Sequence, residues 1–145
     1  MNTQQTQHCY WVADYMISAL GCGTDLNAER ILAYRTGLTT HVDASVCDKP
    51  FVAGRIDWQQ IAPRDGYTHL ERLMLMAVDN VKRQVAALDF AGDAVGLILS
   101  TTKGNIDLLA QSAMSDKRLF LPELAQRIAT ACGVNTKPIV ISNAC

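Results

Sequence analysis

Two short apolar runs that each end in small polar residues constrain the fold of this chain more than any other feature. The first run, residues 95–99, leads into Ser-Thr-Thr-Lys-Gly at 100–104, and the second, residues 138–142, is rich in β-branched residues. Runs this short, bounded by turn residues, are typical of buried strands. Between them, residues 121–132 repeat apolar side chains at helical spacing and are followed by Gly133. A strand, a helix and a second strand predict parallel pairing, because the crossover helix returns the chain to the same end of the sheet.

Further segments extend this alternation of strands and helices. Residues 69–88 carry the strongest amphipathic pattern in the chain, and residues 27–34 also favour a helix. Residues 10–13 indicate a first strand, and residues 50–56 a short extended segment. We therefore expect an α/β fold, with a mostly parallel or mixed sheet flanked by helices.

Composition excludes several classes of protein. The chain has 145 residues, 49% of them hydrophobic, which is enough for one domain with a core. Its net charge is −1 and its basic residues are scattered, so we expect no nucleic-acid partner. The N-terminus is polar and no apolar run has the length of a membrane span, so we expect no signal peptide and no membrane insertion. Five irregularly spaced cysteines favour free thiols in a reducing cytoplasm over a disulfide framework.

Cys145 is the strongest candidate for a reactive side chain. It is the last residue of the chain and follows the predicted strand at 138–142 almost directly. Enzymes with parallel sheets place reactive groups where strands end, and a helix that starts beside a cysteine favours its thiolate. The simpler interpretation is a buried structural cysteine, since free cysteine is often only a small apolar residue. Position alone leaves both interpretations open.

Several segments together resemble the β-ketoacyl synthases, which are condensing enzymes of the thiolase-like superfamily. They are Ile17-Ser18-Ala19-Leu20-Gly21 with Arg35-Thr36-Gly37-Leu38 near the start, the run from Gly96 to Gly104, and the run from Ile139 to Cys145. In that family a strand leads into a turn of small residues, and some forty residues later an Ala-Cys segment carries the nucleophile. The resemblance covers nearly the whole chain in the right order.

The resemblance implies a fold and a reaction. Residues 1–145 would be the N-terminal part of a thiolase-like domain, ending at the nucleophile. The cysteine of such an enzyme accepts an acyl group from a thioester, and decarboxylation of malonyl-acyl carrier protein supplies the carbanion for a Claisen condensation in fatty acid or polyketide-type biosynthesis. The partner would be acyl carrier protein, which brings its own phosphopantetheine arm, and no metal or other cofactor is implied.

The resemblance also implies roles for individual residues. Cys145 would be the catalytic nucleophile. Thr102 and Lys103 lie in the turn that the family places near its acyl tunnel, so they are expected to contact substrate, although a lysine ammonium that simply reaches solvent explains Lys103 equally well. Ile139, Val140 and Ile141 would form the dimer edge, where this strand pairs with its own copy or with a synthase-like partner.

Departures from the family pattern keep alternatives open. The family's two active-site histidines and its lysine follow the nucleophile, whereas His8, His41 and His69 all precede Cys145 and match none of those motifs. We therefore expect the 145-residue chain alone to be inactive in condensation. One alternative is a non-catalytic, synthase-like partner subunit of the kind that shapes chain length. Another is a thiolase-fold acyltransferase that uses coenzyme A thioesters.

Overall fold

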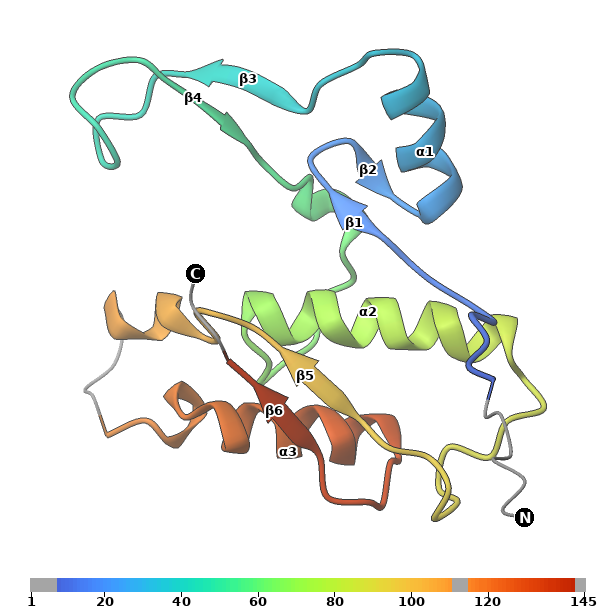
Figure 1. Cartoon of the computed structure of the whole chain (residues 1–145). Coiled ribbons are helices and arrows are strands. Elements are labelled where there is room, and N and C mark those ends of the chain that lie inside the picture. Colours follow the sequence, from blue (N-terminus) through green and yellow to red (C-terminus); the bar gives the residue numbers. More distant parts are fainter. Residues whose placement is uncertain (1–7, 111–114, 143–145) are drawn as a thin grey trace, which may run out of the picture.

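The computed structural model describes residues 8–110 and 115–142, and these residues form a mixed α/β structure. Its α-helices are α1 (Thr24–Leu32), α2 (His69–Gln84) and α3 (Leu121–Cys132). Its strands are β1 (Ile17–Ser18), β2 (Gly21–Cys22), β3 (Leu38–His41), β4 (Phe51–Gly54), β5 (Ile98–Ser100) and β6 (Ile139–Ile141). Figure 1 shows α2, α3, β5 and β6 packed together, with the smaller elements above them.

The expected α/β class is confirmed, but the strands do not form one largely parallel sheet. In the described ranges they form three two-stranded sheets, of which β1–β2 and β3–β4 are antiparallel and β5–β6 is parallel. The antiparallel strands are close neighbours in sequence, so local chain reversal pairs them. Each strand has two to four residues, which limits how many partners it can hold.

The strand expected at residues 10–13 is absent from the structure, so that prediction was wrong. This segment has no strand hydrogen bonds, and Tyr10, Trp11 and Val12 are exposed. The first strand is instead β1, whose Ile17 pairs with Cys22 of β2. Residues 10–13 are apolar, but within the described residues no neighbouring strand forms strand hydrogen bonds with them.

Helix α2 begins at a well-formed cap. Thr68 is its N-cap and accepts a hydrogen bond from the backbone N–H of Glu71, while the Glu71 carboxylate accepts one from the Thr68 N–H. This reciprocal arrangement is a capping box, which satisfies two backbone donors that would otherwise lack partners. The helix ends at Gln84, four residues before the predicted end at position 88, and Leu88 is half exposed.

Helix α3 supplies most of the core, and its limits are those that the sequence predicted. Leu124, Ala125, Ile128 and Ala129 are buried against α2 and β5, together with the other buried members of the cluster, Leu75, Leu99, Cys132 and Val134. Gly133 ends the helix in the left-handed conformation, at φ 71°, where glycine is favoured.

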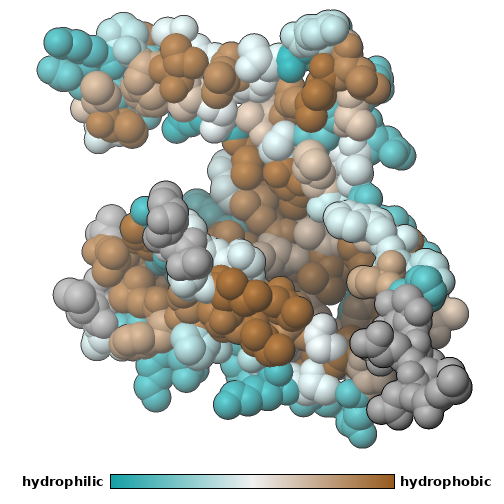
Figure 2. Space-filling view, in the orientation of Figure 1, coloured by the Kyte–Doolittle hydropathy of each residue, from teal (hydrophilic) through white to brown (hydrophobic). Residues whose placement is uncertain are grey.

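One face of the β5–β6 pair is uncovered, which corrects the expectation that both strands are fully buried. Leu99 is buried and Val140 packs on the helical core, but Ile98, Ile139 and Ile141 are at least half exposed. Figure 2 shows an apolar area over these strands on the face turned away from α2 and α3. The strands are apolar on both faces, but the described residues cover only one.

The remaining elements lie apart from this core (Figure 1). Helix α1 starts after Gly23 without a side-chain cap. The β3–β4 hairpin pairs Leu38 with Gly54 and His41 with Phe51. Among the described residues, no helix is long and apolar enough to cross a membrane.

Substitution of Leu124 by alanine tests where the core lies. Leu124 has no exposed surface, so Leu124→Ala is expected to lower the free energy of unfolding by about 2–5 kcal/mol through lost burial and a cavity. Leu88→Ala, at a half-exposed position, is the control and should cost about 1 kcal/mol or less. Urea unfolding followed by circular dichroism measures both. Equal losses in the two variants would contradict this assignment of the core.

Candidate functional site

The parallel register of β5 and β6 brings the ends of both strands to one edge. Ile98 pairs with Ile139, Leu99 with Val140, and Ser100 with Ile141. Beyond the last pair, the Thr101 N–H donates a hydrogen bond to the Ile141 carbonyl oxygen at 3.2 Å. The turn after β5 and the chain that leads toward position 145 therefore leave from the same place. We call this the carboxyl edge, and sheets of this kind commonly bind ligands there.

Residues 101–104 form a tight turn at the carboxyl edge. The Thr101 hydroxyl oxygen accepts hydrogen bonds from the N–H groups of Lys103, at 3.4 Å, and Gly104, at 3.1 Å. Gly104 has φ 58°, and a Cβ there would lie 2.5 Å from Cδ2 of Leu121, the first residue of α3. A side chain at position 104 is therefore disfavoured by the backbone conformation, and it would require the Leu121 side chain to shift.

Of the site residues predicted from the sequence, the structure describes Thr102 and Lys103 but not Cys145. Thr102 and Lys103 lie at the carboxyl edge with exposed side chains. Within the described residues Lys103 forms no ion pair, as expected for an ammonium group that reaches solvent. Its contact with substrate stays a prediction. Cys145 lies outside the described residues, so its role as nucleophile also stays a prediction. Ser142, three positions earlier, is the last described residue.

A buried polar cluster that sequence reasoning missed lies directly behind this edge. It consists of Thr68, Glu71, Asn105 and Arg127, and we call it the Glu71–Asn105 cluster. Glu71 and Asn105 have no exposed surface, although one is a carboxylate and the other an amide. Arg127 reaches Glu71 from α3, with Nε 3.2 Å from Oε1. Buried polar groups of this kind are tolerated only when they are hydrogen-bonded.

Asn105 uses both ends of its side-chain amide. Its Oδ1 accepts a hydrogen bond from the Thr68 hydroxyl at 2.6 Å, and its Nδ2 donates to Oε1 of Glu71 at 3.1 Å and to the Arg118 carbonyl at 3.0 Å. The residue after the turn is thus tied to the N-cap of α2, to the first turn of that helix, and to the segment before α3. Since Gly104 contacts Leu121, both helices begin beside the carboxyl edge.

Part of this cluster had a sequence signal. Thr68-His69-Leu70-Glu71 has the spacing of a capping box and precedes an apolar stripe, which predicts the start of a helix. Asn105 had no such signal, because its partners lie 34 and 37 positions away in the sequence.

A cavity of about 310 Å³ lies beside the start of α2 and mixes both signs of charge. It is lined by Tyr67, Thr68, His69, Arg72, Asp107, Leu108 and Arg118. Arg118 binds Asp116 through two nitrogens, and these hydrogen bonds lower the pKa of the Asp116 carboxyl to about 2. The cation of Arg118 is therefore largely matched by a neighbouring carboxylate.

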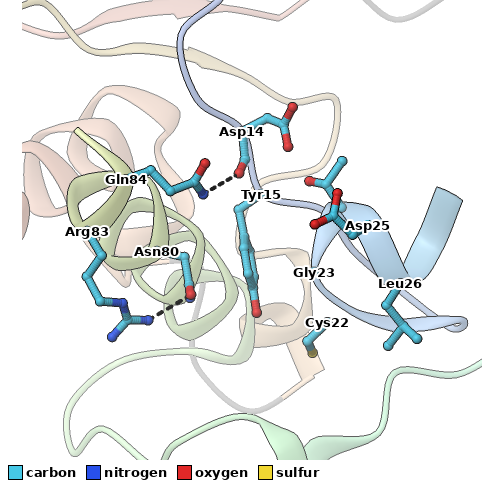
Figure 3. A pocket seen from close by; sticks show the side chains of 10 residues that line it. Asp14, Tyr15, Cys22, Gly23, Asp25, Leu26, Asn80, Arg83 and Gln84 are labelled. Carbon is cyan, nitrogen blue, oxygen red and sulfur yellow. Dashed lines mark hydrogen bonds between the residues drawn. The ribbon is translucent and has the colours of Figure 1, made fainter. Parts of the chain in front are cut away.

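A larger cavity of about 510 Å³ lies between the end of α2 and the start of α1 (Figure 3). Asp14 and Asp25 line it together with Arg83, whose guanidinium donates to Oδ1 of Asn80. Burial raises the pKa of the Cys22 thiol and that of the Tyr15 phenol, so both stay protonated near neutral pH. With mixed charges and neutral side chains, this cavity has no evident nucleophile.

The described cysteines differ in exposure and in the pKa of their thiols. Cys132 is buried in the core, and burial raises the pKa of its thiol, which disfavours the reactive thiolate. Cys9 and Cys47 are exposed. In the part of the chain that the structure describes, no three His, Cys, Asp or Glu side chains gather as a metal site would need.

Comparison with known proteins gives no family for this chain, because no protein-family model, no curated protein and no solved structure matches it.

Replacing Asn105 by aspartate tests the buried cluster through pH. Asn105→Asp sets a second carboxylate against Oε1 of Glu71, so it should cost about 3 kcal/mol of unfolding free energy near pH 8. A proton shared between the two carboxylates relieves the repulsion. The folded state then binds more protons than the unfolded state, and the loss shrinks to roughly half near pH 5.

Asn135→Asp is the matched control, because Asn135 is exposed and donates to the Ala91 carbonyl. Urea unfolding at both pH values measures the effect. A loss that does not depend on pH in Asn105→Asp would show that Asn105 and Glu71 do not face each other.

Proposed function

We propose that this chain is the N-terminal part of a cytoplasmic β-ketoacyl synthase with a thiolase-like fold, in which Cys145 carries the acyl group. The observation that carries the proposal is the parallel register of β5 and β6. It joins the turn at 101–104 to the end of the strand that precedes Cys145 in sequence. These are the two segments on which the resemblance to the family chiefly depends.

The electrostatics of the carboxyl edge support a reaction that develops negative charge. Helices α2 and α3 both begin beside this edge, and the N-terminus of a helix carries partial positive charge. Glu71 offsets part of this field at α2, and Glu123 offsets part of it in the first turn of α3, which has no side-chain cap. Such a field favours a thiolate and a tetrahedral oxyanion over their neutral forms.

The proposed reaction has two stages. In the first, the Cys145 thiolate attacks the carbonyl carbon of an acyl thioester, a new C–S bond forms, and the carrier thiolate leaves and takes up a proton. In the second, malonyl-acyl carrier protein loses carbon dioxide, and its carbanion attacks the acyl-cysteine to form a C–C bond and release the Cys145 thiolate. Within this scheme Thr102 and Lys103 lie near the acyl chain. The phosphopantetheine arm arrives on the carrier protein.

A dimer through β6 follows from the same proposal. Strand β6 bonds β5 on one side, and in the described ranges no strand bonds its other side. Ile139 and Ile141 are also half exposed on the uncovered face. An apolar strand with a free edge favours pairing with another strand, and a second copy or a synthase-like partner would supply one.

Transfer of an acyl group to Cys145 is the direct test of the proposed function. In the intact protein, incubation with an acyl-acyl carrier protein thioester should add one acyl group to Cys145, as measured by peptide mass spectrometry. Cys145→Ser should abolish the adduct, whereas Cys47→Ser, at an exposed cysteine, should leave it unchanged. Absence of any adduct on Cys145 would favour the non-catalytic partner subunit. Acylation by a coenzyme A thioester alone would favour the other thiolase-fold enzymes.

Replacing Val140 by proline tests the dimer edge. Because the Ile139 N–H bonds the Leu97 carbonyl, the N–H of the next residue points toward the free edge. Val140→Pro therefore removes an outward donor while it keeps the bonds to β5, and it should reduce dimer formation by about tenfold or more. Val140→Ala keeps the N–H and is the control. Sedimentation velocity measures both, and a Val140→Pro dimer as tight as that of the control would contradict pairing through β6.

A further inference from the structure

The Glu71–Asn105 cluster is connected to the carboxyl edge by hydrogen bonds and by the peptide bond between Gly104 and Asn105. Asn105 follows Gly104 directly, and the Gly104 N–H donates to the Thr101 hydroxyl oxygen at 3.1 Å. The Thr101 N–H then donates to the Ile141 carbonyl at 3.2 Å. This connection runs from two helices, through the turn, to the last residue of β6.

Within the turn, the Thr101 hydroxyl accepts two backbone hydrogen bonds, whereas the side chains that follow it contribute little. Thr102 and Lys103 are exposed, and Gly104 has no side chain. Ile106 and Leu109, on the far side of Asn105, are half exposed. Leu108 is buried and anchors the segment three residues later, and the buried amide of Asn105 fastens the end of the turn to the start of α2.

The hydrogen bonds of the Asn105 side chain also fix the orientation of its amide group. Its Oδ1 accepts from Thr68 and its Nδ2 donates to Glu71, so the amide fits in one orientation. Glu71 is held in turn by Arg127, which also donates to the Gly66 carbonyl at 2.8 Å and lies over the ring of Tyr67. A satisfied network of this kind holds its members in one arrangement, because each displaced group would leave a buried partner unpaired.

We infer that Asn105 is a positioning residue for the carboxyl edge: through its bonds to Thr68 and Glu71, it holds the turn at 101–104 and, through Thr101, the end of β6. This inference rests on the proposed function in so far as the end of β6 leads to the nucleophile. Its physical content is independent of the chemistry. Asn105 supports the site without contacting substrate.

Amide hydrogen exchange tests the positioning role directly. Asn105→Ala should lower the protection of the Lys103 and Gly104 amides by at least about tenfold, because the turn loses its anchor. Amides of α3 should change less, since α3 is held by its own core. Asn135→Ala is the matched control, because it removes an exposed asparagine before the opposite end of β6 and should leave the turn within about twofold of wild type. Unchanged turn protection in Asn105→Ala would overturn the inference.

Alkylation of Cys145 by iodoacetamide, measured in the same proteins, tests whether the position of the turn affects the reactivity of Cys145. We expect the rate at Cys145 to change at least about fivefold in Asn105→Ala, while the rate at exposed Cys9 stays unchanged. A loosened turn with an unchanged Cys145 rate would show that Asn105 does not act on the strand end. Failure of the proposed function would appear differently, as an absence of the acyl adduct in the wild-type protein while the turn still depends on Asn105.

Asn105→Asp keeps the inference testable if Asn105→Ala does not fold. A proton shared with Glu71 restores a donor at this position at low pH, so turn protection, corrected for intrinsic exchange, should recover from pH 8 toward pH 5. Asn135→Asp should show no such recovery. Protection of the turn in Asn105→Asp that does not vary with pH would overturn the inference.

Discussion

Parallel pairing of β5 with β6 is the constraint on which the rest of the structure depends. Two parallel strands cannot be joined by a tight turn, so the chain must cross from one end of the pair to the other. Helix α3 makes that return and covers one face with Leu124, Ile128 and their neighbours. The same geometry forces both strands to end at one edge, where the turn after β5 meets the carbonyl of Ile141.

The crossover explains why a carboxylate and an amide are buried in so small a core. Between β5 and α3 the described residues form short turns and the 3-10 helices Ile106–Ala110 and Lys117–Leu119, and among these described residues Leu108 is the one buried apolar side chain. Asn105, Glu71 and Arg127 fasten this irregular segment to α2 and α3 by hydrogen bonds. Replacing one partner leaves another buried and unpaired, so the cluster favours one arrangement of the edge.

The sequence predicted what depends on local pattern and missed what depends on distant partners. The limits of α3 follow from helical spacing and from Gly133, and the parallel pair follows from the order of the segments. The prediction of a strand at residues 10–13 was wrong because an apolar run forms a strand only where a neighbouring strand can hydrogen-bond to it. Asn105 was missed because nothing near it in the sequence reveals Thr68 and Glu71. The resemblance to β-ketoacyl synthases stays a prediction, and its nucleophile, Cys145, lies outside the described residues.

Disulfide trapping across β5 and β6 tests the register on which the account depends. Ile98 and Ile139 are register partners on the exposed face, so cysteines at both positions should form a disulfide under mild oxidation. Ile98 with Ile141, two residues out of register, is the control pair and should form it much more slowly. Preferential bonding of 98 with 139 is the predicted result. Preferential bonding of 98 with 141, or of neither pair, would contradict the shared carboxyl edge.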